Sequence, residues 1–190
     1  MKKFINNLAF LSYMIINGEK INLRSLTLLD ADSLYENVKD KEIAEFTTVP
    51  HPYPKDGAKE FIEITQKQAK DETGYQLGIE FEGKIIGMIS LMSVSKVHKN
   101  ANLGYWLGKK FWKRGFTSEA VKLILKFGFI DLKLEKISVT ARHPNEASIN
   151  LIKKIGFVYE GTARKDNFKW GKWTDHLNFS MLREEYDNLF

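Results

Sequence analysis

The segment from Gly104 to Ala120 combines features that suit the binding of an anion. A strand pattern leads into a basic loop, and Gly115 stands where a long apolar helix is predicted to begin. Backbone N–H groups at a helix N-terminus lack intrahelical partners and attract anions, to which Lys113 and Arg114 would add charge. The segment has neither the P-loop pattern nor the glycine pattern of dinucleotide-binding folds. The residues alone therefore leave two alternatives, an anion site and an ordinary helix start.

The hydrophobic pattern predicts the elements that would position this segment. Alternating polar and apolar residues indicate strands, and apolar residues at helical spacing indicate helices. Between two of the strand patterns, Glu82-Gly83 favours a tight hairpin. The predicted strands cover residues 19–25, 75–81, 84–93, 102–108, 136–141, a stretch starting at 157, and 175–182. The predicted helices cover residues 28–34 after the capping residue Thr27, 56–70, 118–129, and 146–155 up to Gly156.

The order of these elements points to an α/β (α+β) fold. Strands come first as a meander and later alternate with helices, which predicts a mixed central sheet that is antiparallel early and partly parallel late. No repeat, linker or low-complexity segment interrupts the pattern. We therefore expect residues 19–190 to form a single domain, preceded by an N-terminal arm of residues 1–18.

The arm has the outline of a signal peptide, because Met1-Lys2-Lys3 is followed by an apolar run that ends at Ile16. The run is too short for a transmembrane helix, and no small-residue cleavage site follows it. We therefore expect a cytoplasmic protein without a membrane partner, whose apolar arm lies on the domain. Met14 is an alternative start, since the patterned sequence begins directly after it.

Composition narrows the chemistry further. Of the 190 residues, 43% are hydrophobic, which excludes a disordered chain. Cysteine is absent, which excludes thiol nucleophiles, disulfides and cysteine-ligated zinc. No metal-ligand spacing links the histidines, so we expect no metal and interpret them as isolated surface or loop residues. They are His51, His98, His143 and His176.

The net charge suggests the kind of partner. Lys and Arg number 29 against 24 Asp and Glu, which gives a net charge of +5 and suits an anionic partner. Nucleic acid is not expected, because no helix-turn-helix, RNP-like aromatic pattern or arginine-rich tract is present.

The segment around Gly115 resembles a known family. The run WKRGFTSEA at 112–120 is similar to the pyrophosphate-binding loop of the GNAT superfamily of N-acetyltransferases, and most similar to the Rim-type branch that acetylates N-terminal amines of ribosomal proteins. That branch typically reads WGKGYATEA there. Other landmarks follow in the family's order over about residues 19–185. They are INLRSL (21–26) with DA (30–31), IIGMI (85–89), GYWL (104–107), NEAS (145–148), KIGF (154–157), EG (160–161) and WTD (173–175).

The resemblance implies a GNAT-like sheet of about six to seven strands flanked by helices, with a splayed pair of parallel strands. It also implies acetyl-CoA as cosubstrate. Pantetheine would lie between the splayed strands on backbone groups of residues 105–107, and the loop at 113–118 would hold the pyrophosphate. Asn145 would bond the pantetheine arm, and Ser148 would protonate the departing thiolate. The implied cofactor-binding residues are Tyr105, Trp106, Leu107, Lys113, Arg114, Gly115, Phe116, Thr117, Ser118, Asn145 and Ser148. The implied catalytic residues are Asn102, Tyr105 and Ser148.

Three residues depart from the pattern of the branch. Asn102 replaces a Glu that can serve as base, and an amide cannot accept the proton, although it can orient a water. Lys113 replaces the first glycine of the loop, which is tolerable if its φ is negative. Thr117 replaces a small alanine. The first departure leaves the base open and favours an easily deprotonated acceptor, such as a terminal amine with a reference pKa of about 8 rather than about 10.4.

Simpler interpretations stay open for these residues. Asn102 can be an ordinary strand residue, Ser148 a hydroxyl on a helix surface, and Asn145 an N-cap. The expected function is transfer of acetyl from acetyl-CoA directly to a primary amine, namely a protein N-terminal amine of the ribosomal-protein type. The alternatives are a small amine acceptor, such as a polyamine or antibiotic, and a non-catalytic acetyl-CoA sensor. A monomer and a homodimer are both compatible with the sequence.

Overall fold

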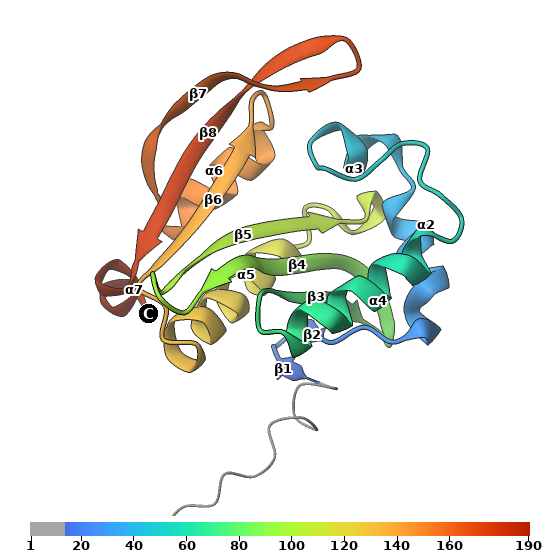
Figure 1. Ribbon diagram of the computed structural model, residues 1–190, viewed down its shortest axis with the longest axis horizontal. Helices are drawn as coiled ribbons and strands as arrows, with labels where there is room; N and C mark the ends of the chain where they lie inside the picture. The colour runs from blue at the N-terminus through green and yellow to red at the C-terminus, as the bar shows by residue number, and fades with distance from the viewer. Residues whose placement is uncertain (1–13) are drawn as a thin grey trace, which may run out of the picture.

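Eight strands form one sheet in the computed structural model, which describes residues 14–190 (Figure 1). The strands are β1 (Ile15–Asn17), β2 (Asn22–Arg24), β3 (Tyr75–Phe81), β4 (Lys84–Ser95), β5 (Asn100–Leu107), β6 (Lys136–Arg142), β7 (Val158–Lys169) and β8 (Lys172–Leu182). Their order is β1-β2-β3-β4-β5-β6-β8-β7, and each neighbouring pair is antiparallel except β5 and β6. The predicted mixed sheet is confirmed, with slightly more strands than the six to seven expected.

Helices cover both faces of this sheet, with α4 in front of it and α5 behind it in Figure 1. The helices are α2 (Ala31–Val38), α3 (Lys41–Glu45), α4 (Gly57–Lys70), α5 (Phe116–Lys126), α6 (Glu146–Ile155) and α7 (Arg183–Leu189). Short 3-10 turns precede α2 (Leu28–Asp30) and α5 (Lys109–Phe111), and a π-helical turn (Phe127–Asp131) extends α5. Within residues 14–190 no helix is long and apolar enough to cross a membrane.

The elements that the pattern missed are short. Strand β1 has three residues, α3 has five and α7 has seven, so none spans more than about two helical turns or strand repeats. Residues 1–13, most of the expected arm, lie outside the described residues, whereas Met14 is buried in the core and β1 pairs with β2. Helix α6 ends as predicted at Gly156, whose φ of 111° is favourable for glycine.

The parallel pair separates partway along its length. Residues of β5 and β6 pair from Asn100 opposite Lys136 to Leu103 opposite Val139. Beyond that point β5 continues along β4 to Leu107, and β6 continues along β8 to Arg142. The two inner edges therefore diverge after Leu103, which confirms the expected splayed pair.

Two apolar clusters hold the helices against the sheet. The larger one includes Leu103 of β5, Val139 of β6, Ile124 of α5 and Ile152 of α6. The smaller one, on the opposite face, contains residues of β4, α2, α4 and the connection after β2: Leu26, Ala31, Leu34, Ala58, Ile62, Ile85 and Met88. Full burial of each Leu or Ile contributes about 1.5–3 kcal/mol, so both helix layers are fixed firmly around the diverging strands.

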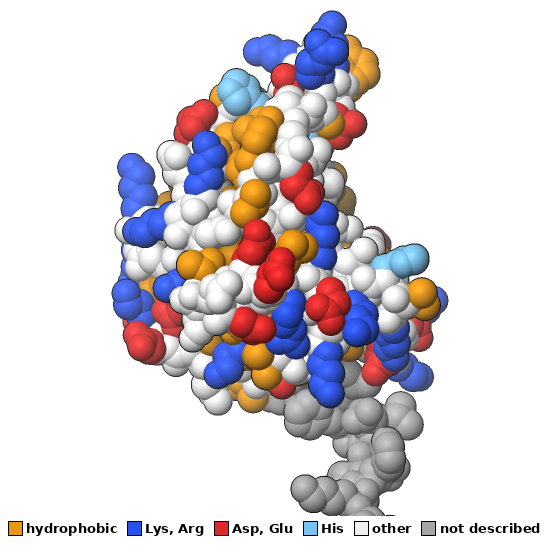
Figure 2. Space-filling view, turned by 90° about the vertical axis from the view of Figure 1, so that its left-hand side faces the viewer, with side chains coloured by type: hydrophobic (Ala, Val, Ile, Leu, Met, Phe, Trp, Pro, Cys, Tyr) orange, Lys and Arg blue, Asp and Glu red, His pale blue; other side chains and the backbone are white. Residues whose placement is uncertain are grey.

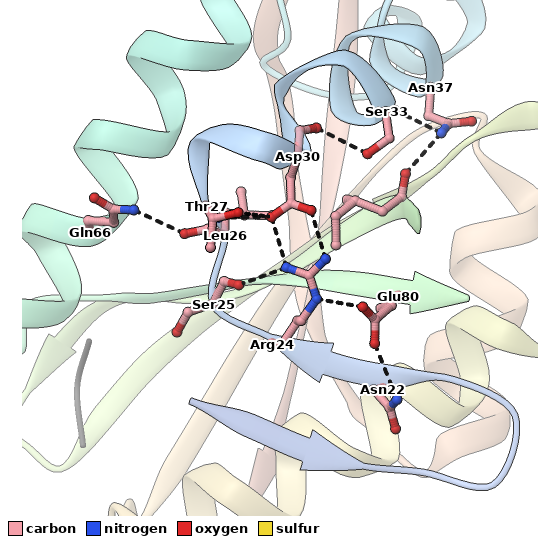
Figure 3. A network of polar contacts seen from close by, with 11 residues as sticks. Asn22, Arg24, Ser25, Leu26, Thr27, Asp30, Ser33, Asn37, Gln66 and Glu80 are labelled. Atoms are coloured by element: carbon pink, nitrogen blue, oxygen red, sulfur yellow. Dashed lines mark hydrogen bonds and ion pairs between the residues drawn. The ribbon is translucent and has the colours of Figure 1, made fainter. Parts of the chain in front are cut away.

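A buried arginine fixes the connection from β2 to α2 (Figure 3). The guanidinium of Arg24 donates to both carboxylate oxygens of Asp30, at 2.8 and 2.7 Å, and to Glu80 at 2.6 Å. The bond to Asp30 raises the pKa of Arg24, against the opposing effect of burial. Burial also opposes the charge of Asp30, but the bonds from Arg24 and the Thr27 N–H outweigh it and lower the pKa of Asp30. One cation is thus matched by two carboxylates.

The β7–β8 hairpin forms one end of the molecule, where Figure 2 shows Lys and Arg side chains gathered at the top. Its outer part carries the exposed aromatic residues Phe168, Trp170 and Trp173. Four basic residues lie in the same stretch, namely Arg164, Lys165, Lys169 and Lys172. Part of the net charge of +5 is therefore located on this hairpin.

Candidate active site

A cavity of about 70 Å³ lies where β5 and β6 diverge. It is bordered by the two strands, the start of α6 and the segment after α3. The lining residues are Phe46, Thr47, Leu103, Gly104, Tyr105, Val139, Thr140, Ala141, Arg142, Asn145 and Ser148. Three residues expected from the sequence, Tyr105, Asn145 and Ser148, therefore share one cavity.

Two hydroxyl groups meet at this cavity. The phenol oxygen of Tyr105 lies 2.8 Å from Ser148 Oγ, and the Ser148 N–H donates to Asn145 Oδ1 at 3.2 Å. Asn145 is thus the N-cap of α6, as the simpler interpretation predicted, and it also fixes the start of the helix that carries Ser148. Burial raises the pKa of Tyr105 to about 12, although its bond to Ser148 acts in the opposite direction. The phenol is therefore neutral at pH 7 and able to donate its proton.

The backbone of β5 presents alternate residues to its two neighbours. The Gly108 N–H donates to the Ile86 carbonyl of β4 at 2.8 Å, and Trp106 pairs with Met88 in the same register. Because antiparallel pairing alternates, Trp106 directs its backbone groups to β4, whereas Tyr105 and Leu107 direct theirs to the diverging edge. The backbone groups of Tyr105 and Leu107 therefore lie at the edge where β5 diverges from β6, as expected. Those of Trp106 point away from that edge.

The basic loop between β5 and α5 is fixed at Trp112 and at Gly115. The indole N–H of Trp112 donates to the Leu107 carbonyl at 2.6 Å, and Gly115 caps α5 with a φ of 84°. A side chain at Gly115 would approach only one atom within 4 Å, the Lys20 Nζ at 3.9 Å. Open space thus lies over the first turn of α5, where Thr117 and Ser118 are half-buried.

Lys113 does not have the negative φ that the sequence pattern requires of a lysine at this position. Its φ is 61°, the left-handed conformation that glycine adopts freely, rather than a negative value. For a residue with a side chain this conformation costs roughly 1–2 kcal/mol. The loop therefore keeps the backbone path expected of a glycine at this position.

Arg114 and Phe116 belong to an aromatic cluster beside the loop. The guanidinium of Arg114 lies 4.7 Å from the ring centre of Phe116 and 4.9 Å from that of Phe81. Phe116 is buried, and its ring centre lies 4.8 Å from that of Phe81. The rings hold the cation of Arg114 at the start of α5, while the residue itself stays exposed.

Lys20 is a residue near the loop that the sequence did not indicate. The carboxylate oxygen Oε1 of Glu119 accepts the backbone N–H groups of Glu19 at 2.6 Å and Lys20 at 2.9 Å. These bonds fix the turn between β1 and β2 against the first turn of α5. The contact joins residues about one hundred positions apart, so no local pattern could have indicated it.

Asn102 lies apart from this group. It is exposed, and it does not line the cavity that Tyr105 borders. Side chains alternate along a strand, so Leu103 and Tyr105 face the cluster around α5, whereas Asn102 and Trp106 face the opposite side. The three residues expected to be catalytic therefore divide between the two faces of β5.

Arg142, at the end of β6, is a second buried arginine and was not expected from the sequence. Its guanidinium donates to the Glu45 carbonyl, to Asn167 Oδ1 at 3.0 Å, and to the Thr47 carbonyl at 3.5 Å. Its Nε has no hydrogen-bond partner among residues 14–190. Burial lowers the pKa of Arg142.

Lys169 of β7 binds the same segment. Its ammonium group donates to the Ala44 carbonyl, to the Thr47 carbonyl at 2.9 Å and to the Val49 carbonyl at 3.1 Å. Burial, and secondly the charge of Arg142, lower the pKa of Lys169. Two cations thus hold the end of α3 and the segment after it through neutral oxygens.

The histidine interpretation needs one correction. His176 is not isolated, because its Nδ1 lies 2.8 Å from a carboxylate oxygen of Asp166 in the neighbouring strand. The pairing of β7 with β8 brings the two together. Across the described part of the chain, no three His, Asp or Glu side chains are grouped closely enough to hold a metal ion.

Comparison with known proteins agrees with this geometry. The sequence model of the family described as an acetyltransferase (GNAT) domain matches residues 20–158. The chain is 29% identical to the "Putative ribosomal N-acetyltransferase YdaF" of Bacillus subtilis over 90% of its length and 95% of that protein. It is 23% identical to the spermidine N(1)-acetyltransferase of Escherichia coli, over 70% of this chain and 72% of that enzyme.

Solved structures share the same architecture. RimL, a ribosomal-protein α-N-acetyltransferase in complex with coenzyme A, superposes with a TM-score of 0.83 over 89% of this chain and 98% of that one. The sequence identity is 16%, so this likeness establishes the fold alone.

Proposed function

The chain belongs to the GNAT acetyltransferase family, and we propose that it transfers the acetyl group of acetyl-CoA directly to the N-terminal amine of a protein. The observation that carries this proposal is the break in pairing between β5 and β6 after Leu103, beside the bonded pair Tyr105 and Ser148. Direct transfer is the simpler route, because the chain has no cysteine to carry the acetyl group.

The residues at the splay and the loop fit acetyl-CoA. Backbone groups of Tyr105 and the N–H of Leu107 face the diverging edge, where the amides of a pantetheine arm would bond, while the Leu107 carbonyl is bonded to the Trp112 indole. Left-handed Lys113 and Gly115 leave the first turn of α5 open for a pyrophosphate. Arg114 and Lys20 supply positive charge there. Acetyl-CoA, when bound, supplies an activated acetyl thioester.

Two groups are suited to stabilise the charges that develop during transfer. The N–H groups of Tyr105 and Leu107 would donate to the oxygen on which negative charge develops. Ser148 would donate a proton to the departing thiolate, and neutral Tyr105 would restore it through their 2.8 Å bond and regain its own proton from solvent. A C–N bond forms as the C–S bond breaks, and water accepts the proton that leaves the amine. Asn102, on the other face of β5, would orient that water.

The nature of the acceptor rests on the chemistry of the amine. A terminal amine, with a reference pKa of about 8, is partly neutral at pH 7 and needs no strong base. The similarity to a ribosomal N-acetyltransferase supports this acceptor. The similarity to a spermidine acetyltransferase favours a polyamine as second candidate. The cytoplasmic location and the oligomeric state stay predictions.

Thiol release from acetyl-CoA tests the proposal. The acceptors are a peptide with a free N-terminus, the same peptide with a blocked N-terminus and an internal lysine, and spermidine. We expect release only with the free N-terminus. A preference for spermidine would show that the acceptor is a polyamine rather than a protein N-terminus. Binding of CoA with no thiol release in the presence of any amine would support the alternative of a non-catalytic sensor.

A further inference from the structure

Two cations beside the cavity, the buried Arg142 and the half-buried Lys169, have no acidic partner within residues 14–190. Arg142 is 8% exposed, and no carboxylate of residues 14–190 lies within 4 Å of it or of Lys169. Within residues 14–190 all of their acceptors are neutral, namely backbone carbonyls at the end of α3 and just after it, and one side-chain amide. A buried charge is ordinarily paired with an opposite charge, so this arrangement is unusual for a purely structural role.

The guanidinium also keeps unused hydrogen-bonding capacity. Arginine has five N–H donors and stays charged in proteins. In Arg142 the Nε–H is buried without a partner, and the bond to the Thr47 carbonyl is long, at 3.5 Å. The Nε–H and a neighbouring N–H together form the fork that binds a carboxylate with two hydrogen bonds.

Arg142 also lies at the end of the cavity near α3, where an acceptor could reach it. It lines the same cavity as Tyr105 and Ser148. Along β6, Val139 and Ala141 face the core cluster that includes α5 and α6 residues, whereas Arg142 contacts the segment after α3. The splay thus has hydroxyl groups on the α6 side and an incompletely paired cation on the α3 side.

Nearby acidic groups are already engaged elsewhere. Asp166 contacts His176 at 2.8 Å, and Asp175 accepts the Lys165 N–H at 2.7 Å. Neither forms an ion pair with Arg142 or Lys169. Lys169 uses its three donors on three carbonyls, so its contribution is charge rather than a further bond.

We infer that Arg142, with Lys169 behind it, binds a carboxylate of the acceptor, so that the preferred acceptor carries an amine and a carboxylate on the same amino-acid residue. An N-terminal Asp or Glu of a protein and a free amino acid share this chemistry. The inference rests on the acetyl transfer of the proposed function and narrows the acceptor to an α-amine with a carboxylate close to it. A polyamine, which carries only positive charges, would be repelled from this end of the cavity.

Steady-state thiol release with charge-matched acceptors tests the inference. One pair is a peptide beginning with Asp and the same peptide beginning with Asn. The other is a free amino acid and its amide, and this pair distinguishes the two sources of the carboxylate. For the wild-type chain we expect the acid of at least one pair to have a kcat/KM at least tenfold above that of its neutral partner.

Three variants locate the preference. Arg142→Gln should reduce it to below about threefold, and Lys169→Met should weaken it by a smaller factor because it removes charge without removing the fork. The matched control is Arg164→Gln, which removes an exposed arginine from the same end of the molecule and should leave the preference unchanged.

The outcomes separate this inference from the proposed function. Equal rates for acid and neutral acceptors in the wild type overturn the inference alone, since acetyl transfer itself persists. An undiminished preference in folded Arg142→Gln also overturns it. Absence of thiol release with every amine overturns the proposed function instead. The wild-type comparison needs no variant, so it decides the matter even if Arg142→Gln fails to fold.

Discussion

The molecule contains two equally buried arginines that are paired in opposite ways. Arg24 is 7% exposed and binds two carboxylates, Asp30 and Glu80. Arg142 is 8% exposed and binds only carbonyl and amide oxygens. The pKa of Arg24 is raised by its bond to Asp30, whereas burial lowers the pKa of Arg142.

This difference separates a group that serves the fold from one that we propose serves a substrate. The carboxylates around Arg24 balance its desolvation within the chain and join β2, β3 and α2. Around Arg142 the described residues supply no such balance. The following predictions test whether the two sites differ in this way.

The largest effect is expected at the paired arginine. Arg24→Met leaves Asp30 and Glu80 without their cation and should lower the free energy of unfolding by about 3–5 kcal/mol. Denaturant unfolding measures this, with Arg164→Met as an exposed control that should change it by less than about 0.5 kcal/mol. A loss below 1 kcal/mol for Arg24→Met would remove the contrast between the two arginines.

The next effect concerns the hydroxyl pair on the other side of the cavity. Ser148→Ala removes the proposed proton donor and should reduce kcat for acetyl transfer by about 10²-fold or more. Unfolding should change little, because Asn145 still caps α6 through the backbone N–H of residue 148. If kcat falls less than threefold, the proton comes from another group, and Ser148 is only a surface hydroxyl.

Acid titration should distinguish the two arginine sites by stability. The lowered pKa of Asp30 means that its contribution is complete above its unfolded pKa of about 3.9 and is lost as the pH falls through the folded value. Unfolding measured from pH 7 to pH 2 should show this loss in the wild type and in Arg142→Gln. In Asp30→Asn the loss should be smaller. An altered acid profile in Arg142→Gln would indicate a carboxylate partner that the contacts do not show.

The smallest effect is expected in the basic loop. Lys113→Gly relieves the left-handed conformation and should raise the free energy of unfolding by about 0.5–1 kcal/mol, after the greater entropy of unfolded glycine is subtracted. Lys113→Ala removes the same charge but keeps the side-chain carbon, so it should give no such gain. Equal gains for both variants would assign the effect to charge rather than to φ.

The regular elements could be read from the sequence because their signals are local. The alternation in β3 and β4, the apolar period of α5 and the glycine after α6 each lie within a few residues of one another. The splayed pair followed from family resemblance, and the structure confirms it. The short elements β1 and α3 gave too few residues for a period.

The contacts that define the site could not be read in this way. Arg142 and Lys169 meet the end of α3 and the segment after it across 95 to 125 positions of sequence, and Lys20 lies beside Gly115 although it belongs to a separate turn. The direction of the Trp106 backbone depends on the register with β4, which a one-residue shift would reverse. Only the assembled sheet determines these relations.

Equilibrium binding of the acetylated product tests the central claim most directly, because it removes chemistry from the comparison. With CoA bound to the full chain, calorimetry would compare a peptide beginning with N-acetyl-Asp against one beginning with N-acetyl-Asn, and an N-acetyl amino acid against its amide. The account predicts that the wild type binds the acid of at least one pair with a Kd at least tenfold lower than that of its neutral partner, and that Arg142→Gln binds both members of that pair alike. Equal affinities within both pairs in the wild type, or an unchanged difference in Arg142→Gln, would contradict it.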